Sequence, residues 1–158
     1  MDTQVLVEVG ARLAAGETLA GDDLRAFGGD TFGSEVLGLV WDEMALGRVT
    51  AHLEPDERHH QPHGIVHGGV WCSVVESMAS VGAALHVIAD GRIIVGVSNS
   101  TDFLRSHRTG RIDAIAEPIH VGRLQQLWQV RLSRADDGKA VARGQVRLHN
   151  LDPQVLGG

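Results

Sequence analysis

QPHGIVHGGVWCSVVESMASVGAAL, residues 61–85, has the periodicity of one long amphipathic helix. From Val70 onward, apolar side chains recur at steps of three and four residues, so that they share one face. Gly68 and Gly69 stand where this helix begins. The first N–H groups of a helix have no partner within it, and they lie there together with the positive end of the helix dipole. The sequence therefore predicts a mostly buried helix over residues 70–85.

The opposite side of this helix is a narrow polar stripe. Its four members fall within about 100° of arc and are Ser73, Glu76, Ser77 and Ser80. An acidic residue on an amphipathic helix is most often exposed to solvent. A solvent-exposed face also carries basic residues, however, and the sequence has no Lys or Arg between His67 and Leu85. We therefore expect Glu76 to line a partly dry site.

The composition is that of a single globular domain of 158 residues. A net charge of −6 argues against a general nucleic-acid-binding protein, which is normally basic. The single cysteine, Cys72, excludes an internal disulfide bond and suits a reducing compartment. The sequence shows neither the pattern of a signal peptide nor an uninterrupted apolar run of about 18 residues. We expect a cytoplasmic protein that binds neither nucleic acid nor a membrane.

The segments on either side of the helix differ in period. Residues 1–30 show helical steps and an acidic balance, with a second short helix expected over 24–27 and ended by Gly28-Gly29. Residues 54–63 are polar and contain two prolines, so a loop is expected. The predicted strands are a hairpin of 36–41 and 48–53, followed by 92–104, 112–120, 124–134 and 139–149.

The residue patterns of two of these strands bear on how the helix and the sheet pack. Ile93, Val95 and Val97 alternate along the strand after the helix, which predicts that they lie on one side of it. The last strand, 139–149, has small inner residues such as Ala142 and Gly144, which predicts the close approach of a bulky element. One helix and one sheet bury each other only when the sheet wraps around the helix. We therefore expect an α+β fold of that kind, with a second subunit covering the outer face of the sheet.

Gly68 and Glu76 suit two different parts of an acyl-transfer reaction. A backbone N–H at a helix N-terminus stabilises an oxyanion, and a carboxylate serves as nucleophile or general base. The two residues are eight positions apart, about 12 Å along a helix. One helix therefore cannot bring both to the same carbonyl group. If both act, Glu76 must come from a second chain related by a two-fold axis, and the site exists only in a dimer.

Two other kinds of site are suggested by single residue types. Four histidines lie close together in the sequence and raise the question of a metal: His59, His60, His63 and His67. Pro62 and Gly64 interrupt any helix there, and no Glu follows His63 as in a zinc-protease motif, so no metal is expected. Cys72 lies among apolar residues, and such a cysteine is more often a small buried side chain than a nucleophile.

A group of basic residues stands near the end of one predicted strand, with one more in a later loop. Its members are Arg105, His107, Arg108, Arg111 and, in the loop, Arg123. A solvated hairpin is one interpretation. The other is a site for a phosphate-bearing anion, which an acidic protein binds only through a local basic patch.

The motif QPxGxxHGG of residues 61–69, followed by Glu76 and Ser80, resembles that of the hotdog-fold acyl-CoA thioesterases. It is most similar to the branch that hydrolyses aromatic acyl-CoAs such as hydroxybenzoyl-CoA and 1,4-dihydroxy-2-naphthoyl-CoA, some members of which act in menaquinone biosynthesis. The resemblance covers about residues 35–150 and implies an antiparallel sheet wrapped around one central helix. The implied boundaries are a helical N-terminal extension at 1–30, a hotdog domain at 31–150 and a loose tail at 151–158.

The resemblance also implies roles for residues of this chain. Glu76 is the nucleophile or general base, Gly68 and Gln61 polarise the thioester carbonyl, His67 lies near the carbonyl and the leaving sulfur, and Ser80 positions the attacking water. The residues implied in binding CoA or substrate are Gly69, Gly96, Phe103, Leu104, Arg105, Ser106, His120, Val121, Gly122, Arg123, Leu124 and Gln125. The family implies an acyl-CoA substrate, no metal or cofactor, and a homotetramer built as a dimer of dimers.

Three other functions remain open at this point. A hotdog domain can act as a non-catalytic acyl-CoA sensor, although such regulators usually add a basic DNA-binding segment, and the first 30 residues here are acidic. A hotdog hydratase needs an Asp–His pair in another place, which the sequence does not show. The acyl group is not fixed either, and a short or medium aliphatic acyl-CoA is an alternative to an aromatic one.

Overall fold

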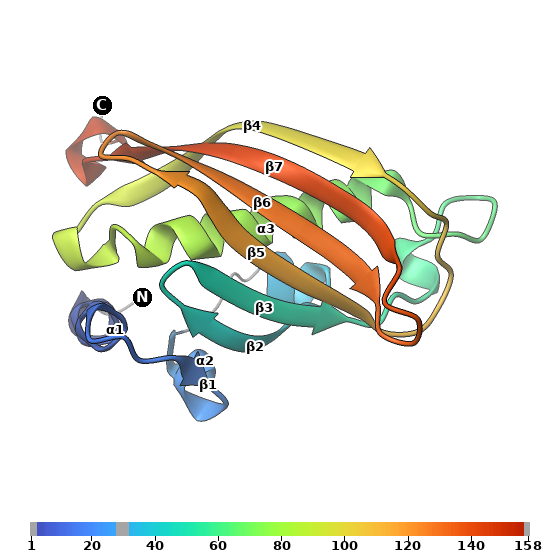
Figure 1. The fold of residues 1–158 in the computed structure, drawn as a ribbon, viewed down its shortest axis with the longest axis horizontal. Helices are drawn as coiled ribbons and strands as arrows, with labels where there is room; N and C mark the ends of the chain where they lie inside the picture. The colour runs from blue at the N-terminus through green and yellow to red at the C-terminus, as the bar shows by residue number, and fades with distance from the viewer. Residues whose placement is uncertain (1–2, 28–31, 157–158) are drawn as a thin grey trace.

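The computed structural model describes residues 3–27 and 32–156 and shows, within them, an antiparallel sheet around one long helix, α3 (Gly68–Leu85) (Figure 1). The seven strands of the described residues are β1 (Leu19–Ala20), β2 (Val40–Ala45), β3 (Arg48–Leu53), β4 (Ile93–Phe103), β5 (Ile112–Val121), β6 (Gln125–Arg134) and β7 (Ala140–Leu151). Their order across the sheet is β1-β2-β3-β5-β6-β7-β4, and every neighbouring pair is antiparallel. The predicted α+β fold, with a sheet around a central helix, is confirmed.

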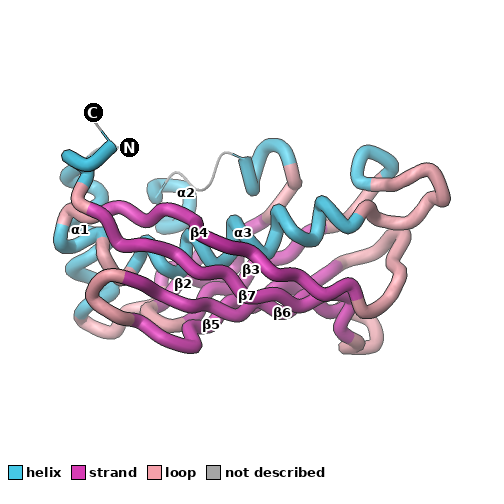
Figure 2. The backbone as a smooth tube through the Cα atoms, turned by 90° about the horizontal axis from the view of Figure 1, so that it is seen from above, coloured by secondary structure: helices cyan, strands magenta, loops and turns pink. Residues whose placement is uncertain are grey.

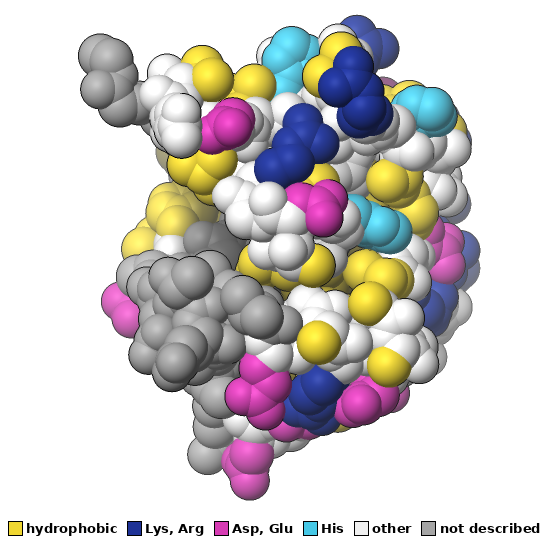
Figure 3. All heavy atoms as spheres, turned by 90° about the vertical axis from the view of Figure 1, so that its left-hand side faces the viewer, with side chains coloured by type: hydrophobic (Ala, Val, Ile, Leu, Met, Phe, Trp, Pro, Cys, Tyr) yellow, Lys and Arg dark blue, Asp and Glu magenta, His cyan; other side chains and the backbone are white. Residues whose placement is uncertain are grey.

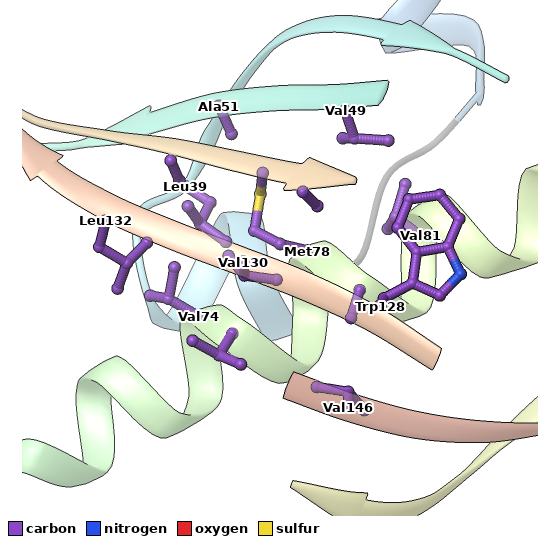
Figure 4. Packing of buried hydrophobic residues seen from close by; sticks show 14 of the residues in the cluster. Leu39, Val49, Ala51, Val74, Met78, Val81, Trp128, Val130, Leu132 and Val146 are labelled. Atoms are coloured by element: carbon purple, nitrogen blue, oxygen red, sulfur yellow. The ribbon is translucent and has the colours of Figure 1, made fainter. Parts of the chain in front are cut away.

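The sheet curves over α3, and the core lies between them (Figures 1 and 2). Val74, Met78 and Val81 of α3 pack in one cluster with Trp128 and Val130 of β6, and all five side chains are buried (Figure 4). The three helix residues stand at steps of four and three, so the stripe predicted from the sequence is the stripe that is buried. Burial of this apolar face stabilises the helix far more than local propensity does.

Two glycines let α3 and the sheet approach closely. A β-carbon on Gly144 of β7 would lie 2.7 Å from Cγ1 of Val75, and one on Gly82 of α3 would lie 2.5 Å from the ring of Trp128. Close-packed interiors have no room for such an added atom. The small inner residues of the last strand therefore serve the close approach of the helix, as predicted.

By length and composition alone, α3 could cross a membrane, because it is 18 residues long and has a mean hydropathy of 1.2. In this fold, 56% of the stretch is buried inside the protein. Its apolar character is therefore that of the core helix.

The hairpin β2–β3 is present, but its first strand begins later than the sequence predicts. A turn of π-helix, η1 (Phe32–Val36), precedes it, and Gly38 has a φ of +72°, a left-handed conformation that does not fit a strand. Leu37 and Leu39 on either side of this glycine are buried. The apolar run thus reflects core packing, and the prediction of a strand over 36–41 is wrong in its bounds.

The N-terminal extension contains α1 (Thr3–Ala14) and α2 (Asp22–Phe27), so its predicted helical character is confirmed. β1 pairs with β2 and covers that edge of the sheet. α1 packs against η3 (Ile88–Asp90), a short 3-10 helix that follows α3. The predicted helix stop at Gly28-Gly29 lies outside the described residues.

The other edge of the sheet is β4, which no described part of the chain covers. Val97 is 51% exposed and Phe103 57% exposed. A β-bulge between Gly96 and Ser98 shifts the alternation of side chains. Val97 is the unpaired residue of this bulge, so the simple alternation of Ile93, Val95 and Val97 predicted from the sequence does not continue through it. An exposed apolar edge strand of this length, 11 residues, is normally paired or protected.

The described residues contain two further 3-10 helices. η2 (Glu57–His59) lies in the predicted loop before α3 and is capped by Asp56. η4 (Pro153–Leu156) follows β7, in the segment for which a loose tail is expected.

Candidate active site

The start of α3 offers one free backbone donor. His67 caps the helix: its Nδ1 atom accepts a hydrogen bond of 2.9 Å from the Gly69 N–H, and its carbonyl oxygen accepts one of 3.0 Å from the Val70 N–H. The Gly68 N–H has no hydrogen-bond partner within the described part of the chain. Because the helix N-terminus also carries a partial positive charge, this N–H is placed to bind a carbonyl oxygen or an oxyanion.

A tight turn holds Gln61 beside this donor. The Gln61 N–H donates to the carbonyl oxygen of Ile65, and the Gln61 carbonyl oxygen accepts from the Gly64 N–H, both at 2.9 Å. Gly64 has a φ of +69°, which this turn requires and which other residues rarely adopt. The turn therefore places Gln61 on the wall of the same pocket as Gly68.

A pocket of about 250 Å³ opens at the start of α3. It is lined by Gln61, Ile65, Val66, Gly68, Trp71, Phe103, Leu104, Arg105 and Ser106. The ring of Phe103 lies against Gly68, where a β-carbon would come within 2.6 Å of it. The structure thus brings the two predicted carbonyl-polarising residues together with the predicted binding stretch 103–106.

Glu76 lies two turns farther along α3 and does not line this pocket. Its Oε2 atom accepts a hydrogen bond of 2.9 Å from Nδ2 of Asn99 on β4. Its Oε1 atom lies against Gly96, where a β-carbon would come within 2.5 Å. Ser80 stands one turn beyond Glu76, and both residues are half-buried. The acid is therefore held between α3 and the edge strand, at a distance from the free N–H.

The predicted CoA-binding loop, residues 120–125, lies at the end of the molecule opposite the start of α3 (Figure 1). The helix of 18 residues separates the two ends by about 26 Å. Asn150 holds the loop by donating from Nδ2 to the carbonyl oxygen of Gly122 (2.9 Å), and Arg92 donates to that of Arg123 (2.8 Å). Figure 3 looks onto this end and shows basic side chains and histidines gathered in its upper part. Within one chain, the two predicted CoA-binding segments are far apart.

The basic residues near the pocket are partly engaged by the chain itself. Arg105 and Arg108 each donate a hydrogen bond of 2.8 Å to a backbone carbonyl oxygen. Arg111 pairs with Asp113 at 2.7 Å, and this hydrogen bond raises the pKa of the guanidinium group. All three arginines are exposed. Since a guanidinium has five N–H donors, each retains donors that can bind a phosphate.

The histidines before α3 serve local structure. Nδ1 of His59 accepts from the Asp56 N–H at 3.0 Å, and its Nε2 lies 3.2 Å from the carbonyl oxygen of Leu37. Nε2 of His60 lies 2.7 Å from another backbone carbonyl oxygen. Among the described residues, no group of three or more His, Cys, Asp or Glu side chains is placed to hold a metal ion.

A larger hollow, of about 790 Å³, lies on the outer face of the sheet. It is lined by Arg48, Ser100, Asp102, Ile115, Glu117, Gln129, Val130, Arg131, Arg143, Gly144 and Gln145. Arg48 and Glu117 form an ion pair of 2.9 Å within it. Neither Gly68 nor Glu76 lines this hollow, so we place the candidate site at α3 and β4.

Three residues of this region have no site role in the prediction from sequence: Trp71, Asn99 and Thr101. Trp71 belongs to the apolar stripe of α3 and is buried, yet it also forms a wall of the pocket. Asn99 and Thr101 stand in the polar run SNSTD, residues 98–102. That run is a weak signal, because the sequence does not show which of its members face the helix.

The sequence is similar to those of known proteins. Residues 63–141 match the family model described as the thioesterase superfamily. A candidate esterase of Mycobacterium tuberculosis, Rv1847, is 46% identical over 77% of this chain and 86% of its own length. The 1,4-dihydroxy-2-naphthoyl-CoA hydrolase of Listeria monocytogenes is 34% identical over 63% of this chain and 80% of its own length.

The fold is similar to those of solved structures. The structure of Rv1847 has a TM-score of 0.74 and 45% identity, and the match covers 78% of this chain and 98% of that one. The crystal structure of AziG from S. sahachiroi has a TM-score of 0.71 and 47% identity, with 74% and 94% covered. Both matches combine a shared fold with high sequence identity.

Proposed function

The chain belongs to the thioesterase superfamily and is a thioester hydrolase; we propose that its substrate is an aromatic acyl-CoA and that two copies of the chain share each active site. One observation carries the proposal. A free N–H at Gly68 and a carboxylate at Glu76 stand on one helix, yet they are too far apart to act on one carbonyl group.

The reaction adds water to the thioester. The oxygen of water bonds to the carbonyl carbon, the C–S bond breaks, and a proton goes to the sulfur to give the free acid and the thiol of CoA. The Gly68 N–H and the Gln61 side chain polarise the carbonyl and stabilise its oxyanion. Glu76 either removes the proton from water or attacks the carbonyl itself, after which water hydrolyses the mixed anhydride. Ser80, one turn from Glu76, positions the water.

A second copy of the chain supplies the missing partner of each group. Gly68 and Glu76 are about 12 Å apart along α3. An antiparallel copy of α3 across a two-fold axis would bring Glu76 of one chain to Gly68 of the other. The exposed apolar edge of β4 supports this arrangement, because it lies beside Glu76 and offers unpaired backbone groups to a second sheet. We expect two such dimers to form a tetramer.

The same axis accounts for the separated binding segments. Arg105 lies at the start of α3 and the loop 120–125 at its end, so reversing the helix in the partner brings the partner's loop toward the pocket. Arg105 of one chain and Arg123 of the other would then face the phosphates of one CoA molecule. A protein with a net charge of −6 needs such a local basic patch to bind this anion.

The pocket favours an aromatic acyl group. Trp71 and Phe103 give it aromatic walls, and Ile65 and Leu104 are aliphatic. Flat rings pack well against such walls. The relative from Listeria monocytogenes is named for 1,4-dihydroxy-2-naphthoyl-CoA. These two facts support a benzoyl- or naphthoyl-CoA as the substrate.

Release of CoA from a panel of thioesters tests the proposal. The panel contains benzoyl-, hydroxynaphthoyl-, phenylacetyl-, short-chain and long-chain acyl-CoAs, and a thiol reagent detects the released CoA. We expect the highest kcat/KM for the aryl-CoAs. Glu76→Ala should lower kcat by at least about 10²–10³-fold, whereas Glu57→Ala, which changes an exposed glutamate outside the site, should not.

Two results would contradict the proposal. Near wild-type turnover by a folded Glu76→Ala protein would remove Glu76 from the reaction. Tight binding of aryl-CoAs without release of CoA from any thioester would instead support a non-catalytic sensor.

A further inference from the structure

We propose that Asn99 and Thr101 of β4 position the carboxylate of Glu76 for the reaction. This inference rests on the proposed function of Glu76 and adds to it the residues that hold the acid. Both act through Glu76 and are positioning residues. They connect the edge strand of the sheet to the acid on the central helix.

Three hydrogen bonds form the connection. Nδ2 of Asn99 donates to Oε2 of Glu76 at 2.9 Å and to the carbonyl oxygen of Cys72 at 3.0 Å. The hydroxyl group of Thr101 donates to Oδ1 of Asn99 at 2.7 Å. Cys72 stands one turn before Glu76, so the Asn99 amide binds the backbone of α3 and the carboxylate together. Both N–H protons of that amide are used, and so is its oxygen.

These partners admit one orientation of the Asn99 amide. If the amide were turned over, Oδ1 would face the Glu76 carboxylate and the Cys72 carbonyl oxygen, which are both acceptors. The Thr101 hydroxyl favours the observed orientation, because it donates to Oδ1 from the other side. Thr101 therefore fixes Asn99, and Asn99 fixes Glu76.

The second oxygen of the carboxylate, Oε1, packs closely against the backbone of β4. A β-carbon at Gly96 would lie 2.5 Å from Oε1 of Glu76, so the carboxylate rests directly against the backbone of β4. Gly96 is not among the residues with a positive φ, so this position needs the absence of a side chain and not a special backbone conformation. Oε1 has no hydrogen-bond partner among the described residues. With Oε2 bound to Asn99, Oε1 is the oxygen that meets water or the thioester.

A glutamate side chain needs such restraint to act as a base or nucleophile. It has three rotatable bonds, and a misplacement of about 1 Å can lower a rate by about 100-fold. A hydrogen bond to an ionised carboxylate is stronger than one between neutral groups. The bond from Asn99 therefore selects one position of the carboxylate, and Thr101 keeps the donor turned toward it.

Steady-state kinetics of matched variants test the inference, with benzoyl-CoA or hydroxynaphthoyl-CoA, whichever the wild type hydrolyses faster. Asn99→Leu keeps the branching and the number of non-hydrogen atoms of the side chain and removes the hydrogen bonds, so kcat should fall about 10- to 100-fold, with KM changed less than about threefold. Thr101→Val removes only the hydroxyl group and should lower kcat about three- to tenfold. Thr101→Ser keeps the hydroxyl group and should restore most of that loss.

A double variant separates positioning from a general structural effect. Because Thr101 acts through Asn99, Asn99→Leu/Thr101→Val should be no slower than Asn99→Leu alone. Thermal unfolding shows whether each variant is folded. If Asn99→Leu does not fold, the two Thr101 variants decide the question, since they differ only in the hydroxyl group and methyl groups of one side chain.

The possible results distinguish this inference from the proposed function. A folded Asn99→Leu protein with the wild-type kcat would overturn the inference, and so would one in which kcat/KM falls only because KM rises. Additive losses of kcat in the double variant would overturn it as well. Equal kcat in Thr101→Val and Thr101→Ser would overturn the part assigned to Thr101. Glu76→Ala, measured in parallel, tests the role of Glu76 itself: if that variant turns over like the wild type, the proposed function fails as well.

Discussion

A hydrogen atom in place of a side chain at Gly96 leaves room for the Glu76 carboxylate, since a β-carbon there would lie 2.5 Å from Oε1. Gly96→Ala should displace the carboxylate and lower kcat about 10- to 100-fold. The melting temperature should change little, because an added β-carbon would meet only the end of the flexible Glu76 side chain among the described residues, and Gly96 does not have a positive φ. Ser98→Ala, at an exposed position on the same strand, is the control and should leave kcat unchanged.

Kinetics and thermal unfolding of the two variants check this prediction together. A folded Gly96→Ala protein with wild-type kcat would show that the acid does not need its place against β4. An equal loss in Ser98→Ala would mean that any change in this strand disturbs the reaction.

Single residues of the site differ in how far the sequence could predict them. Gly68 and Glu76 are indicated by their places on one predicted helix, whereas Gln61 is implied only by the resemblance of the motif in residues 61–69. Asn99 is 23 residues from Glu76, and their contact depends on how β4 lies against α3. The β-bulge between Gly96 and residue 98 shifts the strand by one position, and such a shift decides which side chains face the helix. No pattern in the sequence marks that bulge.

At the scale of elements, α3 depends on its cap. Nδ1 of His67 accepts the Gly69 N–H at 2.9 Å, in the way that an Asn or Asp side chain caps a helix. His67→Ala should lower the free energy of unfolding by about 1 kcal/mol, and His67→Asn should retain most of it. Urea unfolding followed by circular dichroism measures both values. A His67→Ala protein as stable as the wild type would show that the imidazole does not contribute as a cap.

The elements differ in predictability for a physical reason. α3 was predictable because its stripe repeats over five turns and matches one period. The run over 36–41 was not, since a short apolar run fits a strand and a buried turn equally well. In the structure, the positive φ of Gly38 and the burial of Leu37 and Leu39 show that this run begins as a packed turn. The sequence predicts β4 as a strand, but its place at the edge of the sheet follows from the topology and not from its own pattern.

The stability of the whole chain should depend on pH through His86. Its ring packs against Trp128 with the ring centroids 5.6 Å apart, and its Nε2 atom is buried without a partner among the described residues. Burial lowers the pKa of His86 from its usual value of 6.5. A proton therefore binds the unfolded chain more readily than the folded one, and the folded state loses stability as the pH falls below 6.5.

Urea unfolding at about pH 7.5 and about pH 5.5 measures this dependence. His86→Phe keeps a flat ring against Trp128 and binds no proton, so it should lose less unfolding free energy between the two pH values than the wild type. His63→Asn, which changes an exposed histidine, should behave like the wild type. An identical loss in His86→Phe and the wild type would contradict the assignment.

The proposed function requires two copies of the chain for each active site. Spacing along α3 predicts that, if Gly68 and Glu76 act on one carbonyl group, they come from two chains, because the rise of a helix is fixed. The sequence could not show which surfaces meet, since the exposure of Val97 and Phe103 on β4 appears only in the folded sheet. The separation of loop 120–125 from the pocket likewise follows from the topology and not from any motif.

Complementation between two inactive variants tests whether each active site contains residues of two chains. Glu76→Ala lacks the acid, and Gln61→Ala lacks one group that polarises the carbonyl, so each alone should lose about 100-fold in kcat or more. Equal co-expression with random pairing makes about half of the dimers mixed, and each mixed dimer has one intact site if Gln61 and Glu76 act from opposite chains. The activity per chain should then return to about one quarter of the wild-type value. If the mixture shows only the average of the two damaged proteins, Gln61 and Glu76 act within one chain, and the shared site is wrong.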